Sequence, residues 1–405
     1  MKRPRLVLSR RIPFAFPLAV ALFLTGSLGT VRAAVPLGAN LLSNPSAEDG
    51  TLLTPTGWDT SITQVPTARF GWDSDQAHDG KRSLYIINTG NVIPVWFNWS
   101  QTLAGVNDLG GKQLTLRAWV KTRNLSGKAY LLLQAYRDTV LIESLKQGIP
   151  RLVMRQKMSI KPADDPQLEM GWKRQQISGN HDDWTPMEVS VYVPPSTNMV
   201  FVRGGIFGAG EVWFDDFSLT ASPATPEKPF PLAKNLLDDP GFEDNLDNWE
   251  LSLPPLEGLR VDLDGQVTHS GSQSVRLESQ RHPPFQLFSH VCQVFNTRAL
   301  SGKHVRMSGW VRTDHLDAGS AFFSIVGTGQ YGSFRPVIPE GVSGTKDWTF
   351  LSYECDIPKD TYTVWARAAF TTSEGKVWFD DVKFEVLGDA HPASAKARPG
   401  TPKKS

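Results

Sequence analysis

The chain has 405 residues, which suffice for two or three domains of ordinary size. Its 34 Gly and 29 Pro follow no fixed period, and this excludes collagen and a long coiled coil. The formal net charge is +1, and it becomes −5 when the six basic residues before Ala34 are discounted. We therefore expect no nucleic-acid partner, because such a partner calls for a clustered basic face.

The first 33 residues are predicted to form a secretory signal peptide. Residues 1–11 carry five basic side chains and no acidic one, residues 12–28 are mostly apolar, and residues 31–33 read Val-Arg-Ala. This order is typical of a cleaved signal, and two prolines in the apolar part favour cleavage over a membrane anchor. Residues 9–11, Ser-Arg-Arg, also match part of a twin-arginine signal, so both export routes stay open. We expect a secreted or periplasmic protein with no membrane span after cleavage.

The remaining sequence contains two copies of one module. Residues 40–49, which begin Asn-Leu-Leu, match residues 235–244, which begin in the same way. The offset between the copies is 191 residues from Gly111 to Gly302 and 165 residues from Val212 to Val377. One insertion in the first copy, within Val140–Gln176, explains this change, and such insertions usually form surface loops.

The repeat defines the predicted domain boundaries. The two copies occupy residues 39–220 and 235–387. Residues 221–234 contain four prolines and are predicted to be a short stiff linker. Residues 388–405 are rich in Pro, Ala and Lys, and we expect a disordered tail there.

Apolar and polar residues alternate within both copies, which is the pattern of half-buried strands. In the first copy the expected strands are 114–120, 129–137, 188–193, 200–205 and 211–219. In the second copy they are 305–311, 321–326, 350–357, 363–370 and 376–386. Neither copy shows a convincing helical period. We therefore predict an all-β protein with two tandem β-sandwich domains of the jelly-roll type.

The repeated residues resemble the galactose-binding-like jelly-roll carbohydrate-binding modules, which bind xylan, glucan or other polysaccharides. The shared features are the Asn-Leu-Leu opening, the Gly-x-x-Ser turns at 80–83 and 271–274, the Trp-Val strands at 119 and 310, the Asp-Trp-Thr segments at 183 and 347, and the Phe-Asp-Asp endings at 214 and 379. The resemblance implies a polysaccharide partner. Because this fold also serves in spacers and protein-binding modules, an exported structural or adhesion protein that contacts envelope proteins is the alternative.

The same resemblance implies a structural Ca²⁺ in each copy, where the first and last strands are neighbours. Carboxylates from the two ends of the module would supply hard oxygen ligands, which Ca²⁺ prefers. The implied ligands are Glu48, Asp215 and Asp216 in the first copy and Glu243, Asp380 and Asp381 in the second. A capped turn without a metal is the alternative interpretation of these residues.

The modules of this family bind glycans on a concave sheet, where aromatic rings stack on sugar rings beside polar side chains. Alternation places Tyr130, Gln134 and Tyr136 on one strand face, and Trp96 shares a face with Asn98. The candidate contacts are therefore Trp72, Trp96, Asn98, Tyr130, Gln134 and Tyr136 in the first copy and Phe288 and Tyr331 in the second. The alternative is that these aromatic rings cover the edges of the core.

Some jelly rolls are enzymes, so catalytic motifs would indicate a catalytic function here. The sequence contains no Gly-x-Ser-x-Gly, His-Glu-x-x-His, phosphate-binding loop or Cys-x-x-Cys motif. Neighbours in a strand point to opposite faces, so the adjacent acids of Asp215-Asp216 are not expected to act together as a glycosidase pair. We predict a protein without catalytic residues. Cys292 and Cys355 either form a disulfide or remain two separate buried thiols.

Overall fold

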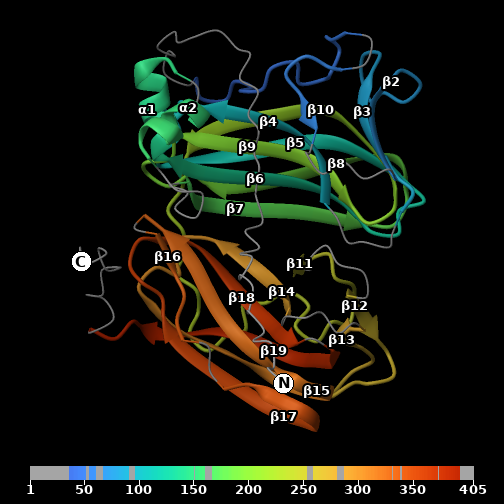
Figure 1. Cartoon of the computed structure of the whole chain (residues 1–405), viewed down its shortest axis with the longest axis vertical. Helices are drawn as coiled ribbons and strands as arrows, with labels where there is room; N and C mark the ends of the chain where they lie inside the picture. Colours follow the sequence, from blue (N-terminus) through green and yellow to red (C-terminus); the bar gives the residue numbers. More distant parts are fainter. Residues whose placement is uncertain are drawn as a thin grey trace, which may run out of the picture.

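A computed structural model describes residues 36–51, 54–60, 67–90, 96–149, 151–159, 167–252, 259–280, 287–330, 332–337, 340–372 and 374–392. These residues form two β-sandwich modules, which lie one above the other in Figure 1. The predicted fold class, an all-β chain with two tandem β-sandwiches, is confirmed. The predicted signal peptide, residues 393–405 of the predicted tail and Tyr331 lie outside the described residues.

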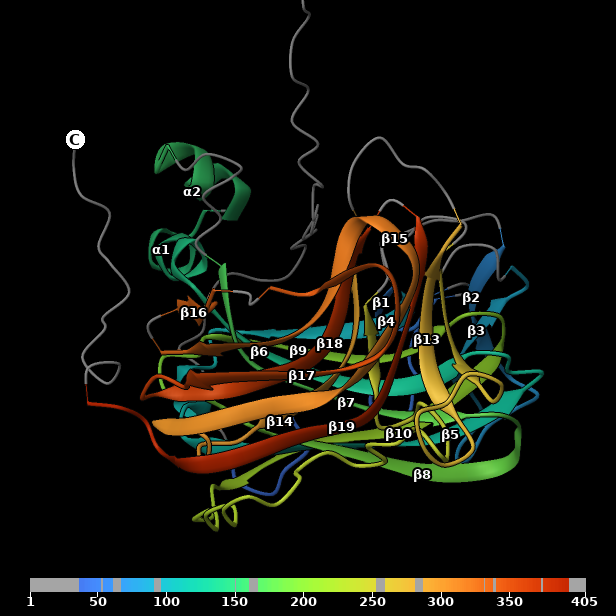
Figure 2. The same cartoon turned by 90° about the horizontal axis from the view of Figure 1, so that it is seen from below.

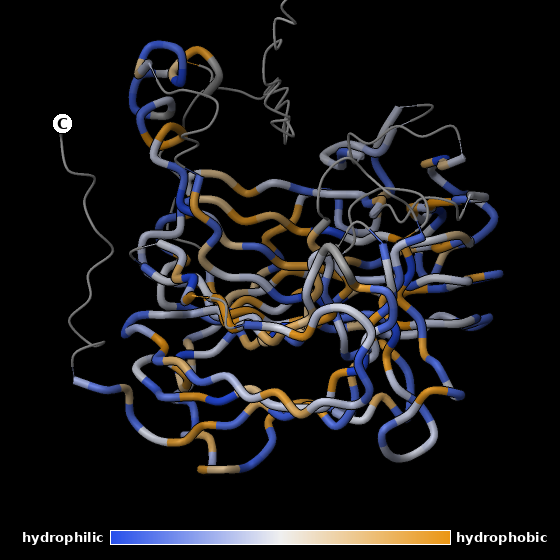
Figure 3. Tube along the Cα trace, turned by 60° about the horizontal axis from the view of Figure 1, so that its bottom comes forward, coloured by the Kyte–Doolittle hydropathy of each residue, from blue (hydrophilic) through white to orange (hydrophobic). Residues whose placement is uncertain are grey.

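Module 1 consists of two five-stranded sheets, ordered β1-β4-β9-β6-β7 and β2-β3-β10-β5-β8. Its elements are β1 (Asp59–Thr60), β2 (Ala68–Asp73), β3 (Ser83–Asn88), β4 (Trp96–Ala104), η1 (Asn107–Leu109), β5 (Lys112–Arg123), β6 (Lys128–Asp138), α1 (Thr139–Gln147), α2 (Arg151–Lys157), β7 (Gln167–Ser178), β8 (His181–Tyr192), β9 (Met199–Phe207) and β10 (Gly210–Pro223). Buried and half-buried residues alternate along all of β4, and the core holds Phe97 and Trp99 from this strand and Phe214 from the opposite sheet. The same alternation of hydropathy is visible along many strands in Figure 3.

Module 2 has the same two layers, but its strands are joined into one continuous sheet. Its elements are β11 (Glu250–Ser252), β12 (Leu259–Asp264), β13 (Ser274–Ser279), β14 (Leu287–Asn296), β15 (Lys303–Gly329), β16 (Gly332–Phe334), β17 (Val342–Asp356), β18 (Thr361–Thr372) and β19 (Gly375–Asp389). The first half of β15 pairs with β17 and β19, and its second half pairs with β18. Register shifts between Val311 and Ala321 mark the place where this strand bends from one layer to the other.

The expectation that the insertion forms a loop and that neither copy contains a helix was wrong. The insertion forms α1, α2 and the regular strand β7, which extends the β1-β4-β9-β6 sheet by one strand. Asp138 caps α1 by accepting a hydrogen bond from the Leu141 N–H, and Gly148 ends it with a φ of 62°. The helices are nine and seven residues long, too short for a clear helical period in the sequence. Figure 2 shows both helices at one end of the sheets.

The length and apolarity of the helices decide whether either could cross a membrane. In the part of the chain that the structure describes, neither helix has the length and apolarity that crossing a bilayer requires.

The two modules meet along β7, which is the edge strand of its sheet and lies against β14, β15 and β18 (Figure 1). The Trp172 and Trp365 ring centroids are 6.5 Å apart, and the Thr363 hydroxyl donates to the Met170 carbonyl at 3.4 Å. Thr363 and Trp365 alternate with the core residue Val364, so β7 packs on the face of module 2 that points away from its core. Module 1 therefore covers part of the outer face of the β14-β18-β15 layer of module 2.

The linker is attached to module 2 and is not a free spacer. The Glu227 carboxylate accepts hydrogen bonds from the backbone N–H groups of Arg298 and Ala299 at 2.9 and 3.1 Å. It also accepts one from the Thr297 hydroxyl. These bonds fix the linker at the end of β14 and support a defined arrangement of the two modules.

Cys292 and Cys355 are free thiols. Their strands are not neighbours, because β18 and β15 lie between β14 and β17 in the sheet. Burial raises the pKa of both thiols to about 12. Both are therefore protonated and unreactive in the folded protein at neutral pH.

This arrangement predicts that two thiols per chain will be titrated in denaturant when the protein is purified without a reductant. Because no bond is broken, a reductant should leave the melting temperature unchanged. Ellman titration and thermal melts with and without dithiothreitol measure these quantities. Fewer than two titratable thiols, together with a melting temperature that falls on reduction, would contradict the separation of the two cysteines.

Candidate ligand-binding sites

Five of the predicted glycan contacts lie together on one face of the β1-β4-β9-β6-β7 sheet. The register places Asn98 and Tyr130 on either side of Gly205, and it places Trp96 opposite Phe207. Gln134 and Tyr136 follow Tyr130 on the same face of β6. The missing side chain of Gly205 makes room for Tyr130, since a Cβ there would lie 2.5 Å from the tyrosine ring.

The aromatic rings of this face are already covered by protein. The Trp96 ring stacks on Phe207 with centroids 4.2 Å apart, and the Arg174 guanidinium lies 3.7 Å from the Trp96 ring centroid. Tyr130 is 1% exposed, and its hydroxyl donates to the Phe97 carbonyl at 3.2 Å. Neither ring therefore offers a free face on which a sugar could stack.

The polar side chains of this face also satisfy one another. The Tyr136 hydroxyl donates to a Glu169 oxygen at 2.7 Å, and the Gln134 amide donates to the same oxygen at 3.0 Å. Arg203 donates to the Gln134 carbonyl oxygen. Burial raises the pKa of Glu169 and of Tyr136. Glu169 and Arg174 come from β7, so the inserted strand is what closes this face.

Two other predicted contacts lie elsewhere. Trp72 lies on β2 in the opposite sheet, where it packs against the core and under the Arg82 guanidinium, 4.0 Å from its ring centroid. Phe288 lies on β14 and is 37% exposed beside His290 and Phe322. The structure therefore does not bring Trp72 to the sheet that carries Trp96 and Tyr130.

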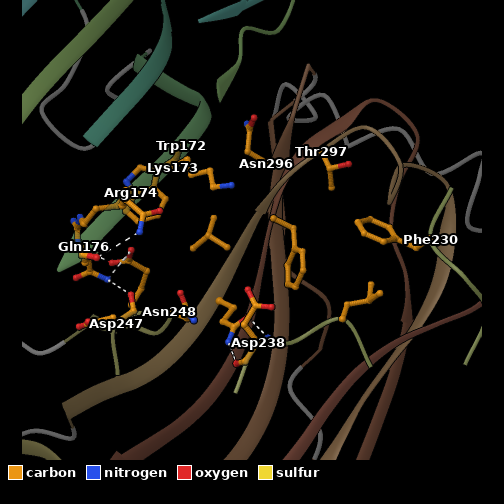
Figure 4. A pocket seen from close by; sticks show the side chains of 16 residues that line it. Trp172, Lys173, Arg174, Gln176, Phe230, Asp238, Asp247, Asn248, Asn296 and Thr297 are labelled. Carbon is orange, nitrogen blue, oxygen red and sulfur yellow. Dashed lines mark hydrogen bonds and ion pairs between the residues drawn. The ribbon is translucent and has the colours of Figure 1, made fainter. Parts of the chain in front are cut away.

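A cavity of about 310 Å³ lies between the two modules, and we call it the interdomain cleft (Figure 4). One wall is β7, and the other is formed by β14, the linker and the first residues of module 2. Its lining includes Trp172, Lys173, Arg174, Gln175, Gln176, Phe230, Asp238, Asp247, Asn248, Glu250, Gln293, Asn296 and Thr297. Sequence reasoning missed this site because it belongs to neither repeat alone.

A buried ion pair closes the cleft at its base. Arg174 Nη1 lies 2.6 Å from Glu250 Oε2, and the two side chains are 11% and 12% exposed. Nearby, Lys128 donates to the Leu246 carbonyl and lies 3.8 Å from an Asp247 oxygen. Burial lowers the pKa of Lys128 to about 8 and raises the pKa of Glu250. These four charges link β6 and β7 of module 1 to the opening of module 2.

Two buried polar atoms on the cleft residues have no hydrogen-bond partner among the described residues. They are Gln176 Oε1, which is an acceptor, and Arg174 Nε, which is a donor. The Gln176 amide nitrogen does have a partner, since it donates to Glu250 at 3.2 Å. An unpaired buried polar atom costs about 1–3 kcal/mol, so these two atoms lower the stability of this part of the interface.

The predicted calcium ligands meet at one turn in each module. In module 1, Glu48 Oε1 accepts from the Lys81 and Arg82 N–H groups at 2.8 and 3.0 Å. Asp215 Oδ2 accepts from the His78 and Asp79 N–H groups at 2.8 and 3.3 Å. The opening and closing carboxylates thus hold the two ends of the same turn.

Module 2 repeats this arrangement. Glu243 accepts from the Ser272 N–H, and Asp380 accepts from the His269 and Ser270 N–H groups at 2.8 and 3.1 Å. Burial raises the pKa of Asp380, as it raises the pKa of Asp215 in module 1 to about 6. The repeated pattern indicates that the turn and its two carboxylates belong to the module itself.

The adjacent acids do not point to opposite faces, contrary to the expectation from strand geometry. Asp216 has a φ of 49° and Asp381 a φ of 50°, and in module 1 the register of β10 shifts after Asp215. As a result Asp216 Oδ2 lies 2.6 Å from His78 Nδ1, and Asp381 Oδ2 lies 2.7 Å from His269 Nδ1. Both acids of each pair therefore reach the same histidine.

The carboxylate oxygens at these turns are ligands of the kind that Ca²⁺ prefers. In this structure, however, they already accept hydrogen bonds from protein groups. Both Asp216 oxygens accept hydrogen bonds, one from Ser46 and one from His78. Within the described residues, three carboxylate or histidine ligand atoms do not gather at either turn. Calcium would have to complete its six to eight oxygens with backbone carbonyls and water.

No protein-family model matches the chain. An uncharacterized HTH-type transcriptional regulator of Bacillus subtilis, YbfP, is 22% identical over 161 residues. The alignment covers 39% of this chain and 54% of that protein, so the chain matches only about half the length of this relative.

Solved structures with similar architecture include carbohydrate-binding modules. The CBM22-1–CBM22-2 tandem domain of Paenibacillus barcinonensis Xyn10C is 16% identical and covers 88% of this chain and 100% of that chain, with a TM-score of 0.32. The C-terminal family 22 module of Clostridium thermocellum Xyn10B is 16% identical and covers 40% of this chain and 99% of its own, with a TM-score of 0.31. At these values the likenesses do not place the chain in a family.

Proposed function

We propose that this protein binds a polysaccharide in the interdomain cleft and does not cleave it. The observation that carries the proposal is a cavity of about 310 Å³ whose lining combines aromatic rings with many polar side chains. Ligand sites occur preferentially at domain interfaces and have this mixed lining. The predicted concave face of module 1 is a weaker candidate, because its rings and polar groups are occupied.

The composition of the cleft suits a sugar. The half-buried rings of Trp172 and Phe230 offer apolar surface, and a pyranose ring presents an apolar face for such contact. Asn248 lines the cleft and is exposed, so its amide can bond a sugar hydroxyl. A neutral, hydroxyl-rich ligand can bond the polar side chains of the lining without bringing a further charge to the buried ion pair.

The cleft also contains carboxylates, and hydrolysis must be tested beside binding. A glycosidase needs one carboxylic acid free to protonate the leaving oxygen and a second carboxylate across the bond. Glu250 is engaged by both Arg174 and Gln176, at 2.6 and 3.2 Å. This engagement favours a structural role for Glu250 and supports binding without cleavage.

Replacement of Trp172 by alanine should weaken retention by the bound polysaccharide at least about tenfold, because truncating a buried aromatic contact typically costs more than about 1.4 kcal/mol. Asn248→Ala should weaken it as well without disturbing the fold, since Asn248 is exposed. Affinity electrophoresis of residues 34–405 against a polysaccharide panel measures both effects. Trp72→Ala is the matched aromatic control outside the cleft, and Tyr136→Phe tests the concave face.

Each outcome of this experiment is informative. Loss of retention in Trp172→Ala and Asn248→Ala, with Trp72→Ala unchanged, supports the cleft. Loss only in Tyr136→Phe would move the site to the concave face of module 1. If the protein releases new reducing ends from the polysaccharide and the variant Glu250→Gln does not, the function would be hydrolysis and not binding alone. Absence of retention by every glycan would reject carbohydrate binding.

A structural or adhesion role is the second candidate, and the packing of the modules favours it. The face of module 1 that carries Trp96 and Tyr130 is closed by β7, and the outer face of the β14-β18-β15 layer of module 2 is partly covered by module 1. The insertion also presents exposed apolar side chains on and beside α2, namely Val153 and Met158 at 48% and 41% exposure. Under this proposal an envelope protein would contact the helices, and the sandwiches would act as a rigid spacer.

We further propose that the protein is exported and that each module holds a structural calcium ion. Residues 1–33 support secretion or delivery to the periplasm through their signal-like order of charges and apolar residues. Calcium at the two turns stays a prediction, supported by the paired carboxylates of each module. If the ion is present, Glu48 with Asp215 and Asp216, and their repeats Glu243, Asp380 and Asp381, would hold it.

A further inference from the structure

A cluster of histidine and carboxylate side chains lies on module 2, away from the interdomain cleft and from both turns. His304 at the start of β15 is the cross-strand partner of Asp356 at the end of β17. His391 follows the end of β19, and its segment is held by a hydrogen bond from the Ala390 N–H to the Gly302 carbonyl at 2.9 Å. One ligand atom from each of these three residues lies within 4.8 Å of the other two.

The contacts within the cluster converge on one carboxylate. His304 Nδ1 lies 2.8 Å from Asp356 Oδ1, and His391 Nδ1 lies 3.0 and 3.1 Å from the two Asp356 oxygens. On its other side, His304 Nε2 lies 3.2 Å from Glu354 Oε2. Glu354 is two residues before Asp356 on β17 and therefore shares its face of the strand.

Each of the two ring nitrogens of His304 therefore faces a carboxylate. A neutral imidazole carries one N–H, so one of its two ring nitrogens would present a lone pair to a carboxylate. A metal ion at Nδ1, with the proton on Nε2, satisfies both contacts at once. Metal-bound histidines commonly donate their second nitrogen to a carboxylate in this way, and this bond orients the ring.

We propose that His304, Asp356 and His391 bind a divalent transition-metal ion such as Zn²⁺, with Glu354 as the residue that positions His304. Two imidazoles and a carboxylate form a mixed nitrogen and oxygen set, which suits Zn²⁺ better than Ca²⁺ or Mg²⁺. Ligands about 2.0–2.1 Å from a tetrahedral ion lie about 3.3 Å apart. The nitrogen-to-oxygen distances of 2.8 to 3.1 Å are close to this spacing.

The sandwich itself does not need this cluster. In module 1 the equivalent cross-strand pair of β5 and β8 is Gln113 and Tyr192. Asp356 and His304 are largely buried, with side chains 10% and 18% exposed, whereas the His391 side chain is 66% exposed. An ion could therefore enter from solvent on the His391 side, and it would fasten the segment after β19 to the β15–β17 pair.

Isothermal titration of the tag-free, EDTA-treated full chain with ZnCl₂ tests the site. We expect one ion per chain. The variant His304→Gln introduces the residue that module 1 has at the equivalent position, Gln113, and we expect it to weaken zinc binding by at least about tenfold. His391→Ala and Glu354→Gln should each weaken it in the same direction. His315→Ala is the matched control, because His315 is 78% exposed and lies outside the cluster.

Substitution of Co²⁺ provides a second measurement, because a four-coordinate cobalt site absorbs in the visible range and this absorption should vanish in His304→Gln. The proposal is supported if stoichiometric binding and the cobalt spectrum both depend on His304 and His391. It is rejected if zinc shows no saturable binding, which would mean that the three side chains only form hydrogen bonds with one another. Equal binding by the His304→Gln/His391→Ala double variant would likewise reject it.

Discussion

Replacement of Arg174 by alanine is expected to destabilise the arrangement of the two modules by about 3–5 kcal/mol, because it leaves the buried Glu250 carboxylate without its partner. The ion pair is 2.6 Å long and both side chains are about nine-tenths buried. Arg174 also covers the Trp96 ring, so the variant loses packing in module 1 as well. Denaturant unfolding measures the change in stability, and small-angle X-ray scattering should show a larger radius of gyration.

Arg117→Ala is the matched control for this prediction. Arg117 pairs with Glu188 at the same distance of 2.6 Å, but the two side chains are 58% and 50% exposed. An exposed pair contributes about 0–1 kcal/mol, so this variant should unfold close to the wild type. The double variant Arg174→Met/Glu250→Leu should recover much of the loss, because both buried charges are removed together. If Arg174→Ala cost no more than Arg117→Ala, the ion pair would not hold the modules together.

Asp380→Ala should destabilise module 2 by about 3 kcal/mol or more. The Asp380 carboxylate is fully buried and accepts backbone hydrogen bonds from His269, Ser270 and Asp381 at 2.7 to 3.1 Å. Its removal leaves three partly buried N–H groups without their acceptor, and an unpaired group costs up to about 1–3 kcal/mol where it is buried. Thermal melts followed by circular dichroism should show a lower transition for one module. Asp215→Ala should have the same effect on module 1.

Asp347→Ala is the control for the aspartate variants. Its side chain is 85% exposed and makes only a surface contact with Arg312 among its described ion pairs, so the expected change is within about 0.5 kcal/mol. The same melts recorded with EDTA and with CaCl₂ test the calcium hypothesis. If calcium is bound, EDTA should lower the melting temperature of the wild type and have little effect on a variant that lacks Asp215 and Asp380. A wild-type melt that is indifferent to both additions would show that the turns are closed by hydrogen bonds alone.

Much of each module could be predicted from sequence because the relevant signals are local. The alternation in β4 and β10 fixes which residues face the core, and the repeat shows that two sandwiches follow one another. The meeting of Glu48 and Asp215 at one turn was implied by the resemblance and agrees with the hydrogen bonds to residues 78–82. The face shared by Trp96 and Asn98 on β4, and the face shared by Tyr130 and Gln134 on β6, likewise follow from the period of two along each strand.

The errors arose in the inserted segment of the first copy and where the backbone departs from the regular strand period. α1 was missed because nine residues show little more than two turns of a helix, and β7 was taken for part of a loop. The expectation that the two acids of each pair point to opposite faces was wrong because Asp216 and Asp381 adopt positive φ. A positive φ at a non-glycine residue leaves no reliable trace in a single sequence.

The sequence by itself determined the fold class, the repeat and the core faces, since each depends on residues within one strand or one module. The tertiary structure alone decided that β7 covers the ring of Trp96 and that Arg174 meets Glu250. It also decided that a cleft opens between the modules and that His304 and His391 share Asp356. These features depend on how separately folded segments pack against one another, and that packing is set by shape and charge across long sequence distances, which no periodic pattern records.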